Sequence, residues 1–131
     1  MATYMYRGTV CSELDAIKDF VNDTLNNLKS RLNDNDTIFD IRLILNELIV
    51  NGALHGNDCL ESKNVDLCLE LYDDKVIIEV VDEGEGITDF DLGRYNPTDL
   101  KSWGRGLVLV NGLSDELYVN KNKVVSIKYL N

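Results

Sequence analysis

The first part of the chain changes from a strand pattern to a helical one. "TYMYRGTV" (3–10) alternates apolar and polar residues and is rich in residues that favour strands, so a strand is expected there. Residues 12–32 carry apolar side chains at the spacing of a helix. Ser12 followed by Asp15 is typical of an N-cap with an acidic first turn, which places the start of this helix.

A second helix is expected directly afterwards. "NDND" (33–36) breaks the apolar period, and Asp36 can cap a helix over residues 37–55. Gly56 follows the last periodic residue, as glycines commonly do at the C-terminal end of a helix. Two consecutive helices therefore separate the first strand from the rest of the chain.

The second half is predicted to contain two hairpins with a loop and a short helix between them. "NVDLCLELYD" and "KVIIEVVD" alternate on either side of the turn Asp73-Asp74, and a last pair of strands is expected around Asn120–Asn122. Residues 83–103 are rich in Gly and Asp and read as a loop. "GRGLVLVNGL" (104–113) has the composition of a short apolar helix.

The element order is therefore β-α-α-β-β-loop-α-β-β. This order predicts an α+β fold, a two-layer α/β sandwich in which helices pack on one face of a mostly antiparallel mixed sheet. A doubly wound fold would need regular alternation of strands and helices, which this order lacks. The length of 131 residues fits a single domain over 1–131.

Composition and charge narrow the class of protein. The net charge is −10 at pH 7, so nucleic acid and anionic membranes would repel the chain, although a small phosphate-bearing ligand needs only local donors. Three cysteines without metal-type spacing indicate reduced thiols and a cytoplasmic location. The chain shows neither a signal peptide nor an apolar run of about 18 residues, and its single histidine disfavours a zinc site.

The second predicted helix carries a line of polar residues. Glu47, Asn51 and His55 occupy successive fourth positions and so share one face, among leucines and isoleucines. A solvated helix edge would explain them too, but a buried carboxylate is costly unless it is paired or lies beside water or a metal. An Asn oxygen can bind Mg²⁺, and a Glu one turn earlier can accept a proton from a hydroxyl.

"VVDEGEGI" (80–87) ends a predicted strand with a carboxylate. Asp82 can accept a hydrogen bond from an exocyclic amine such as that of adenine. Gly84 and Gly86 let the chain turn sharply and let a flat ligand approach the backbone. Any acidic turn can have this form, so the motif gains meaning only from its neighbours.

"GRGLVLVNGL" opens a predicted helix with two glycines around a cation. Free N–H groups and the helix dipole at this end attract an anion, and Gly104 and Gly106 remove side chains where a phosphate would lie. Arg105 adds forked donors, although a plain helix start with a surface arginine would look the same. Together the three motifs would supply a Mg²⁺ ligand, a base-reading acid and a phosphate cradle, with residues 87–103 able to close over the ligand.

The ordered motifs resemble those of the GHKL ATP-binding superfamily (the Bergerat fold), and more narrowly those of bacterial anti-sigma factor serine/threonine kinases. "ELIVNGALHG" is similar to their E-x-x-x-N-A-x-x-H-G box, and "VVDEGEGI" to their D-x-G-x-G box. "GRGLVLVNGLSDEL" is similar to the box that opens G-x-G-L and ends L-x-D-E-V. The boxes span residues 47–117 in the family order, and it is this ordered set that carries the resemblance.

The resemblance implies a role for each matching residue. Glu47 would be the general base toward a protein serine or threonine hydroxyl, Asn51 would hold the Mg²⁺ that bridges the ATP phosphates, and Asp82 would bind the adenine amine. Residues 88–103 would form a lid over ATP. The other positions implied to line the nucleotide site are His55 and Gly56 in the first box, Gly84, Gly86 and Ile87 in the second, and Gly104, Arg105, Gly106 and Leu107 in the third.

The resemblance also implies partner switching. Such kinases hold a sigma factor, phosphorylate a small STAS-domain anti-anti-sigma protein, and often form homodimers. The alternative is a non-catalytic module of the same fold that binds ATP or only a partner protein. The catalytic half of a two-component histidine kinase is a third reading, which is disfavoured because no helix with a phosphorylatable histidine precedes the ATP motifs.

This chain departs from the family pattern at two places. Gly52 stands where the family has Ala, which adds helix flexibility at a cost of about 1 kcal/mol. Lys123, Val124 and Val125 stand where the family has a Gly-Thr pair before the last strand. That threonine helps the family to bind adenine, so its contact is not expected here.

Overall fold

The computed structural model describes residues 1–57, 62–84 and 102–130. It confirms the expected order of strands and helices, with bounds shifted by a few residues. The loop predicted between the third strand and the third helix lies largely outside the described residues. The elements are β1 (Tyr4–Cys11), α1 (Leu14–Lys29), α2 (Asn35–Asn51), a π-helical turn η1 (Gly52–Gly56), β2 (Asn64–Leu71), β3 (Lys75–Val81), α3 (Ser102–Leu113), β4 (Glu116–Asn120) and β5 (Lys123–Tyr129).

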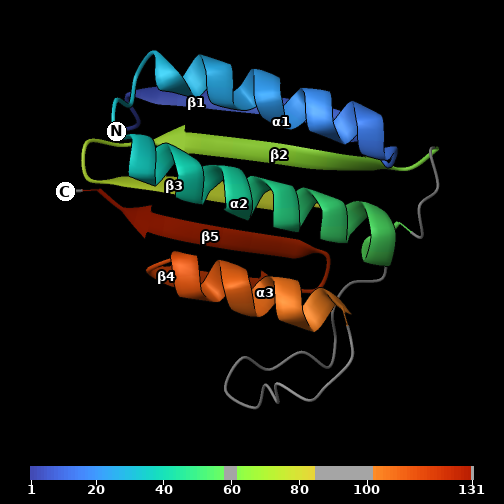
Figure 1. Ribbon diagram of the computed structural model, residues 1–131. Coiled ribbons are helices and arrows are strands. Elements are labelled where there is room, and N and C mark those ends of the chain that lie inside the picture. Colours follow the sequence, from blue (N-terminus) through green and yellow to red (C-terminus); the bar gives the residue numbers. More distant parts are fainter. Residues whose placement is uncertain (58–61, 85–101, 131) are drawn as a thin grey trace.

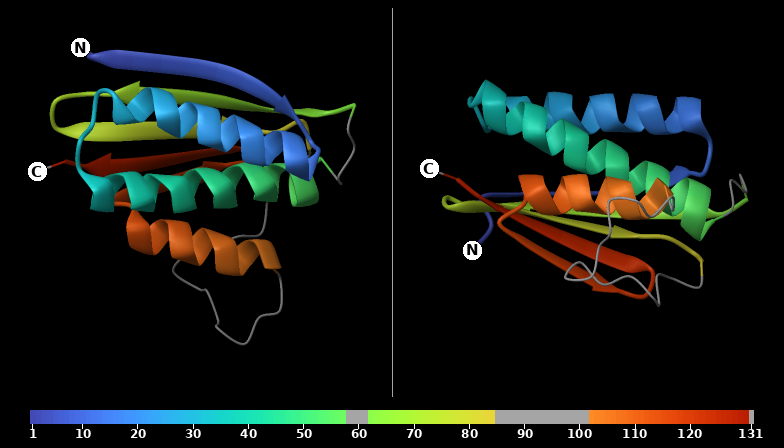
Figure 2. Two further views of the ribbon diagram at one scale, coloured as in Figure 1. Left: turned by 45° about the horizontal axis from the view of Figure 1, so that its top comes forward. Right: turned by 60° about the horizontal axis from the view of Figure 1, so that its bottom comes forward.

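The described strands form one five-stranded sheet in the order β1-β2-β3-β5-β4, and each neighbouring pair is antiparallel. Both predicted hairpins, β2–β3 and β4–β5, are present, and the second places β5 beside β3. The helices α1, α2 and α3 all lie on the same face of this sheet (Figures 1 and 2). The predicted α+β sandwich with helices on one face is therefore confirmed.

The core lies between the helices and the sheet. β2 alternates buried and more exposed residues, so that Val65 and Leu69 face the helices at 0% exposure. From the other side, α2 contributes Ile41, Ile44 and Leu45, which are also fully buried. Each such side chain stabilises the fold by about 1.5–3 kcal/mol relative to an exposed position. This packing fixes α2, which carries the polar line, against the centre of the sheet.

The predicted caps of the first two helices are wrong by one or two residues. Glu13, rather than Ser12, caps α1, because its carboxylate accepts a hydrogen bond of 2.9 Å from the N–H of Asp15. Asp34 caps α2 and accepts from the N–H of Asp36 at 3.1 Å. Both caps satisfy N–H groups that the first helical turn leaves free.

Lys128 of β5 contacts both α2 and α3. Its Nζ donates to the carbonyl oxygen of Leu113, at the end of α3, over 3.0 Å. The same Nζ lies 3.1 Å from Oδ2 of Asp40 in α2. This half-buried ammonium therefore holds α2 and α3 side by side.

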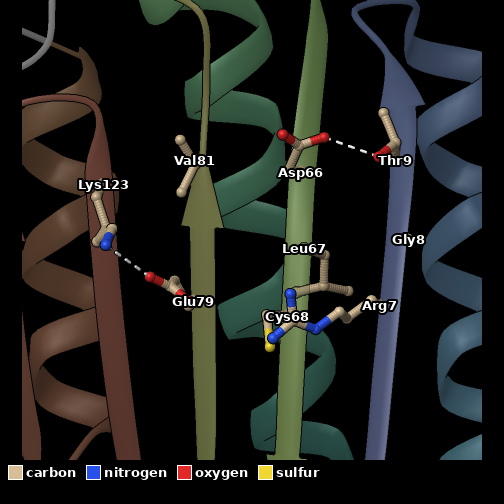
Figure 3. A pocket seen from close by; sticks show the side chains of 9 residues that line it. All are labelled: Arg7, Gly8, Thr9, Asp66, Leu67, Cys68, Glu79, Val81 and Lys123. Atoms are coloured by element: carbon tan, nitrogen blue, oxygen red, sulfur yellow. Dashed lines mark hydrogen bonds and ion pairs between the residues drawn. The ribbon is translucent and has the colours of Figure 1, made fainter.

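The other face of the sheet is free of helices within the described ranges (Figure 2). A hollow of about 450 Å³ lies over it, across β1, β2, β3 and β5 (Figure 3). Four of its polar side chains are paired: Lys123 Nζ lies 3.0 Å from Glu79 Oε1, and the Thr9 hydroxyl donates to Asp66 at 2.8 Å. A ligand here would have to break these pairs, so the helical side offers the better candidate site.

Two thiols also lie toward this open face. Cys11 and Cys68 form no disulfide among the described residues, whereas Cys59 lies outside them, so the expected reduced state stays a prediction. Burial raises the pKa of the Cys68 thiol, which leaves less of the reactive thiolate at neutral pH. None of the helices in the described part of the chain has the length and apolarity needed to cross a membrane.

Candidate functional site

The helices α2 and α3 run side by side over the sheet and bring two of the predicted motifs together (Figures 1 and 2). A Cβ atom placed on Gly106 would lie 2.5 Å from Oε2 of Glu47 and 2.9 Å from Nδ2 of Asn51. Real side chains do not approach so closely, and any residue larger than glycine would displace both groups. The first and third motifs therefore meet at Gly106.

The amide of Asn51 is buried and incompletely bonded. Its Nδ2 is inaccessible to solvent and has no hydrogen-bond partner within the described part of the protein. A buried amide group left unpaired costs about 1–3 kcal/mol, and native proteins seldom tolerate this cost without a reason. An unpaired amide at the meeting point of two motifs indicates a group prepared for a ligand.

The donor set fits Mg²⁺ only in combination with a ligand. Within the described ranges, no group of three or more His, Cys, Asp or Glu side chains could hold a metal ion. Mg²⁺ is usually bound through one or two protein oxygens together with substrate phosphates. The Asn51 amide, with the Glu47 carboxylate beside the same glycine, fits a Mg²⁺ that is shared with phosphates.

The helix that carries Asn51 ends differently from the prediction. Regular α-helix stops at Asn51 and a wider π turn follows over Gly52–Gly56, closed by the N–H of Asn57, which donates to the carbonyl of Gly52 at 2.8 Å. The predicted single helix over 37–55 is therefore wrong in its last turn. Such π turns recur at functional sites, where they change the direction of a helix without ending it.

Gly52 brings the second motif to the first. A Cβ atom placed on Gly52 would lie 3.4 Å from the Cβ of Asp82 and 3.4 Å from Cγ2 of Val65. The end of β3 thus lies directly against the turn that follows Asn51. An alanine would still fit at this distance, so glycine is not required here by packing alone. All three motifs are neighbours through α2 and its π turn.

Asp82 directly follows β3, as the sequence predicted. Its Oδ1 accepts a hydrogen bond of 2.7 Å from the N–H of Gly84. Burial raises the pKa of the Asp82 carboxyl, and the Gly84 N–H and the nearby Lys63 charge only partly oppose this effect. A carboxylate accepts several hydrogen bonds, so Asp82 can take a further donor from a ligand beside Gly84.

The raised pKa of Asp82 predicts a pH-dependent cost in stability. Because the folded protein binds this proton more tightly than the unfolded chain, the contribution of Asp82 is full below the ordinary pKa of 3.8 and is lost as pH rises through the raised value. The Asp82→Asn variant is therefore expected to be more stable than the wild type at pH 7, with an advantage that disappears toward pH 4. Denaturant unfolding at both pH values measures this; an equal difference at both would contradict it.

Asn57 is a polar residue of the site region that the sequence analysis missed. It is 0% exposed, and its Nδ2 donates to Ser12 Oγ at 3.0 Å and to the Asn64 carbonyl at 2.9 Å. Its Oδ1 accepts from the N–H of Glu83 at 2.7 Å. Its only signal in the sequence is its place directly after the His-Gly pair, where an asparagine is typical of an exposed turn.

The third helix starts earlier than predicted. α3 begins at Ser102, so Gly104 and Arg105 lie in its first turn, where the N–H groups lack partners within the helix. The side chain of Leu107 is 1% exposed and belongs to the core, so only its backbone can face a ligand. Residues 123–125 stand where the resembled family has a Gly-Thr pair. Among them, Val124 is buried and pairs with Val80 in the sheet, and it carries no hydroxyl.

Several predicted site positions lie outside the described residues. The side chains of His55 and Arg105 are among them, although the backbones of both residues belong to described helices. The remaining ones are Gly86, Ile87 and the lid residues up to position 101. The structure thus brings together Glu47, Asn51, Asp82, Gly84 and Gly106 and leaves the expected lid untested.

Comparison with known proteins gives one matching family and several relatives. The family described as histidine kinase-like ATPase domain matches residues 11–129. A serine-protein kinase RsbW from Staphylococcus epidermidis is 32% identical over 104 residues, covering 72% of this chain and 65% of the relative. RsbW from Bacillus velezensis is 31% identical over 121 residues, covering 82% of this chain and 75% of the relative. An anti-sigma F factor from Clostridium perfringens is 30% identical over 94 residues, covering 67% of each.

The chain spans a little under two thirds of the Staphylococcus relative's length. The range matched to the family runs from the end of β1 to the end of β5 and contains all three motifs. The antiparallel sheet covered by helices on one face agrees with this match. The chain therefore belongs to the family of histidine kinase-like ATPase (GHKL) domains.

Proposed function

We propose that this protein is a serine/threonine protein kinase of the anti-sigma factor type. It would use ATP to phosphorylate a STAS-domain antagonist, and would sequester a sigma factor while the antagonist is phosphorylated. One observation carries the proposal: the Glu47 carboxylate and the Asn51 Nδ2, which has no partner among the described residues, face the same glycine, Gly106, in the second turn of α3. The relatives named RsbW kinase and anti-sigma F factor support it at the level of the family.

The nucleotide would lie between the end of β3 and the start of α3. Asp82 would accept from the amine of adenine, with Gly84 and Gly86 leaving space for the flat base. At the other end, the first-turn N–H groups of α3 near Gly104, together with Arg105, would bind the phosphates. Binding at a helix N-terminus offsets phosphate charge without a dedicated cluster of cations.

Asn51 would hold Mg²⁺ through its amide oxygen, jointly with the ATP phosphates. A Mg²⁺ held there would supply positive charge to offset the negative charge of the phosphates during transfer. The protein's own contribution is to keep this amide buried and aimed toward Gly106. The unpaired atom is Nδ2, a donor, so a phosphate oxygen of the loaded site would supply its missing partner while Oδ1 would face the Mg²⁺.

Glu47 lies one helical turn before Asn51 and would act on the acceptor. Its carboxylate would accept a hydrogen bond from the serine or threonine hydroxyl of the antagonist and then take up its proton. Since Glu47 Oε2 and the Asn51 amide face the same point on α3, the hydroxyl would be held beside the phosphate. Nucleotide binding alone would not require a carboxylate at this place, which favours the kinase over a non-catalytic module.

The decisive experiment is incubation with radiolabelled ATP, Mg²⁺ and a STAS-domain protein from the same cell. Label on a serine or threonine of that protein supports the kinase. Tight ATP binding without any transfer would instead establish the non-catalytic module. Recovery of a sigma factor with the protein, and of a homodimer by sedimentation, would test the proposed partners separately.

The Gly106→Ala variant is expected to keep its fold but to lose about 10²-fold in transfer rate. The atoms nearest to the added methyl group are the ends of the Glu47 and Asn51 side chains, which can move without unfolding the protein. A displacement of about 1 Å at a reacting group costs a factor of this size.

Gly112→Ala is the matched control on the same helix, because a Cβ atom placed on Gly112 has no neighbouring atom within 4 Å. Initial rates of transfer, with thermal unfolding of both variants, measure the difference. Wild-type transfer by Gly106→Ala would show that Glu47 and Asn51 do not act from their observed positions.

A further inference from the structure

Two asparagines hold the backbone at Asp82 without contacting its carboxylate. Asn57 accepts from the N–H of Glu83 at 2.7 Å, and its own backbone N–H closes the π turn after Asn51. Its other amide bonds reach Ser12 and Asn64, so the end of β1 and the start of β2 anchor it. A fully buried, fully bonded amide of this kind fixes the peptide after Asp82 relative to the helix that carries Asn51.

Asn122, in the turn between β4 and β5, forms hydrogen bonds with the same segment. The side-chain Nδ2 of Asn122 donates to the backbone carbonyl of Asp82 at 2.6 Å, and the backbone carbonyl of Asn122 accepts from the N–H of Asp82 at 3.1 Å. The peptide groups on both sides of Asp82 are therefore bonded to a single residue 40 positions away in the sequence. With Asn57, three backbone groups of Asp82 and Glu83 are held from two directions.

This double attachment determines where the Asp82 carboxylate points. The carboxylate itself bonds only locally, to the N–H of Gly84 among its described partners. Its direction must therefore come from the backbone, and the backbone is set by Asn57 and Asn122.

We propose that Asn57 and Asn122 are positioning residues that determine the preference of the site for adenine over guanine. The inference rests on the proposed function, in which Asp82 accepts from the base. Adenine presents an amine donor at its six-position, whereas guanine presents a carbonyl acceptor that a well-placed carboxylate repels. A carboxylate free to turn away would lose the bond to adenine and the repulsion of guanine together.

The test measures the affinities of ATP and GTP by calorimetry in the full chain. Asn57→Ala is expected to lower the ratio of the two affinities about tenfold, because it removes three bonds at a buried position. Asn122→Ala, at a half-buried turn, is expected to lower the ratio by a smaller factor in the same direction. Asn22→Ala is the control: it removes an Asn–Arg42 bond of 2.9 Å between α1 and α2 and should leave the ratio unchanged.

A second comparison separates positioning from general loosening of the fold. In an Asp82→Ala background, Asn57→Ala should have no further effect on the ratio, since the side chain through which it acts is absent. If Asn57→Ala does not fold by circular dichroism, Asn122→Ala alone in both backgrounds decides the question. An unchanged ratio in Asn122→Ala would then overturn the proposal.

The outcomes also separate this inference from the proposed function. A wild type that binds neither nucleotide would end both. A wild type that binds both equally would end this inference and leave the kinase to be decided by the transfer experiment. A wild type that prefers ATP, loses the preference in Asp82→Ala and keeps it in Asn57→Ala and Asn122→Ala would overturn only the positioning role. Loss of the preference in all three variants supports it.

Discussion

The Glu47→Gln variant is expected to bind ATP like the wild type and to transfer its phosphoryl group about 10²–10⁴ times more slowly. Glutamine keeps the volume beside Gly106 and can still accept a hydrogen bond from a hydroxyl. It cannot take up the proton that the hydroxyl must lose. The expected result is therefore a loss in the rate of the chemical step, with little change in nucleotide affinity.

Single-turnover transfer to a STAS-domain protein measures the rate, and calorimetry with ATP and Mg²⁺ measures the affinity. Glu70→Gln is a matched control, because Glu70 is a half-buried glutamate on the open face of β2, bonded to the Tyr72 hydroxyl at 2.7 Å. It should leave both quantities unchanged. Transfer by Glu47→Gln at the original rate would remove Glu47 from the role of base.

The Asn51→Ala variant is expected to abolish Mg²⁺-dependent ATP binding without loss of stability. The amide nitrogen that it removes is buried and has no partner in the described part of the chain, so its removal relieves a cost of about 1–3 kcal/mol that offsets the lost packing. The free energy of unfolding should therefore stay close to that of the wild type. Loss of binding in a variant of unchanged stability can be attributed to the site itself.

ATP titrations with Mg²⁺ and with a chelator, beside denaturant unfolding, measure the two effects. Asn46→Ala is the control on the same helix, at an exposed position away from Gly106. It should retain Mg²⁺-dependent binding. Unchanged ATP affinity in Asn51→Ala would contradict the assignment of the metal ligand and would leave the unpaired amide without an explanation.

The secondary structure could be predicted because its signals are local. Buried and more exposed residues alternate along β2 and β3, and the buried ones point toward the helices. The apolar residues of α1 recur with a helical period, and Ile17, Val21 and Leu28 are indeed buried. Each of these elements buries one face, so the sequence period and the observed burial agree.

The caps and the π turn could not be predicted because their causes lie far away in the sequence. Ser12 has the side chain of an N-cap, but its hydroxyl donates to the carbonyl of Lys63 at 2.9 Å, 51 positions away. Asn57 takes Ser12 as a partner, which leaves the capping of α1 to Glu13. A pattern read along the chain cannot show such a competition between local and tertiary partners.

The positions of the candidate site residues could be predicted only where they depend on local spacing in the sequence. The four-residue spacing of Glu47 and Asn51 places both on one face of α2, which is local information. The approach of Gly106 depends on the packing of α3 against α2, and the sequence indicated it only through the order of the motifs. The attachment of Asp82 by Asn57 and Asn122 has no local signature at all.

The π turn after Asn51 makes the number of residues in this segment as important as their identity. Asn57 reaches Ser12 and Glu83 only because the turn over Gly52–Gly56 is wider than an α-helical one. Loss or gain of one residue here would rotate Asn57 away from these partners while leaving the helix before it intact. An insertion or deletion of one residue within the turn is therefore expected to move Asp82 away from Glu47 and Asn51.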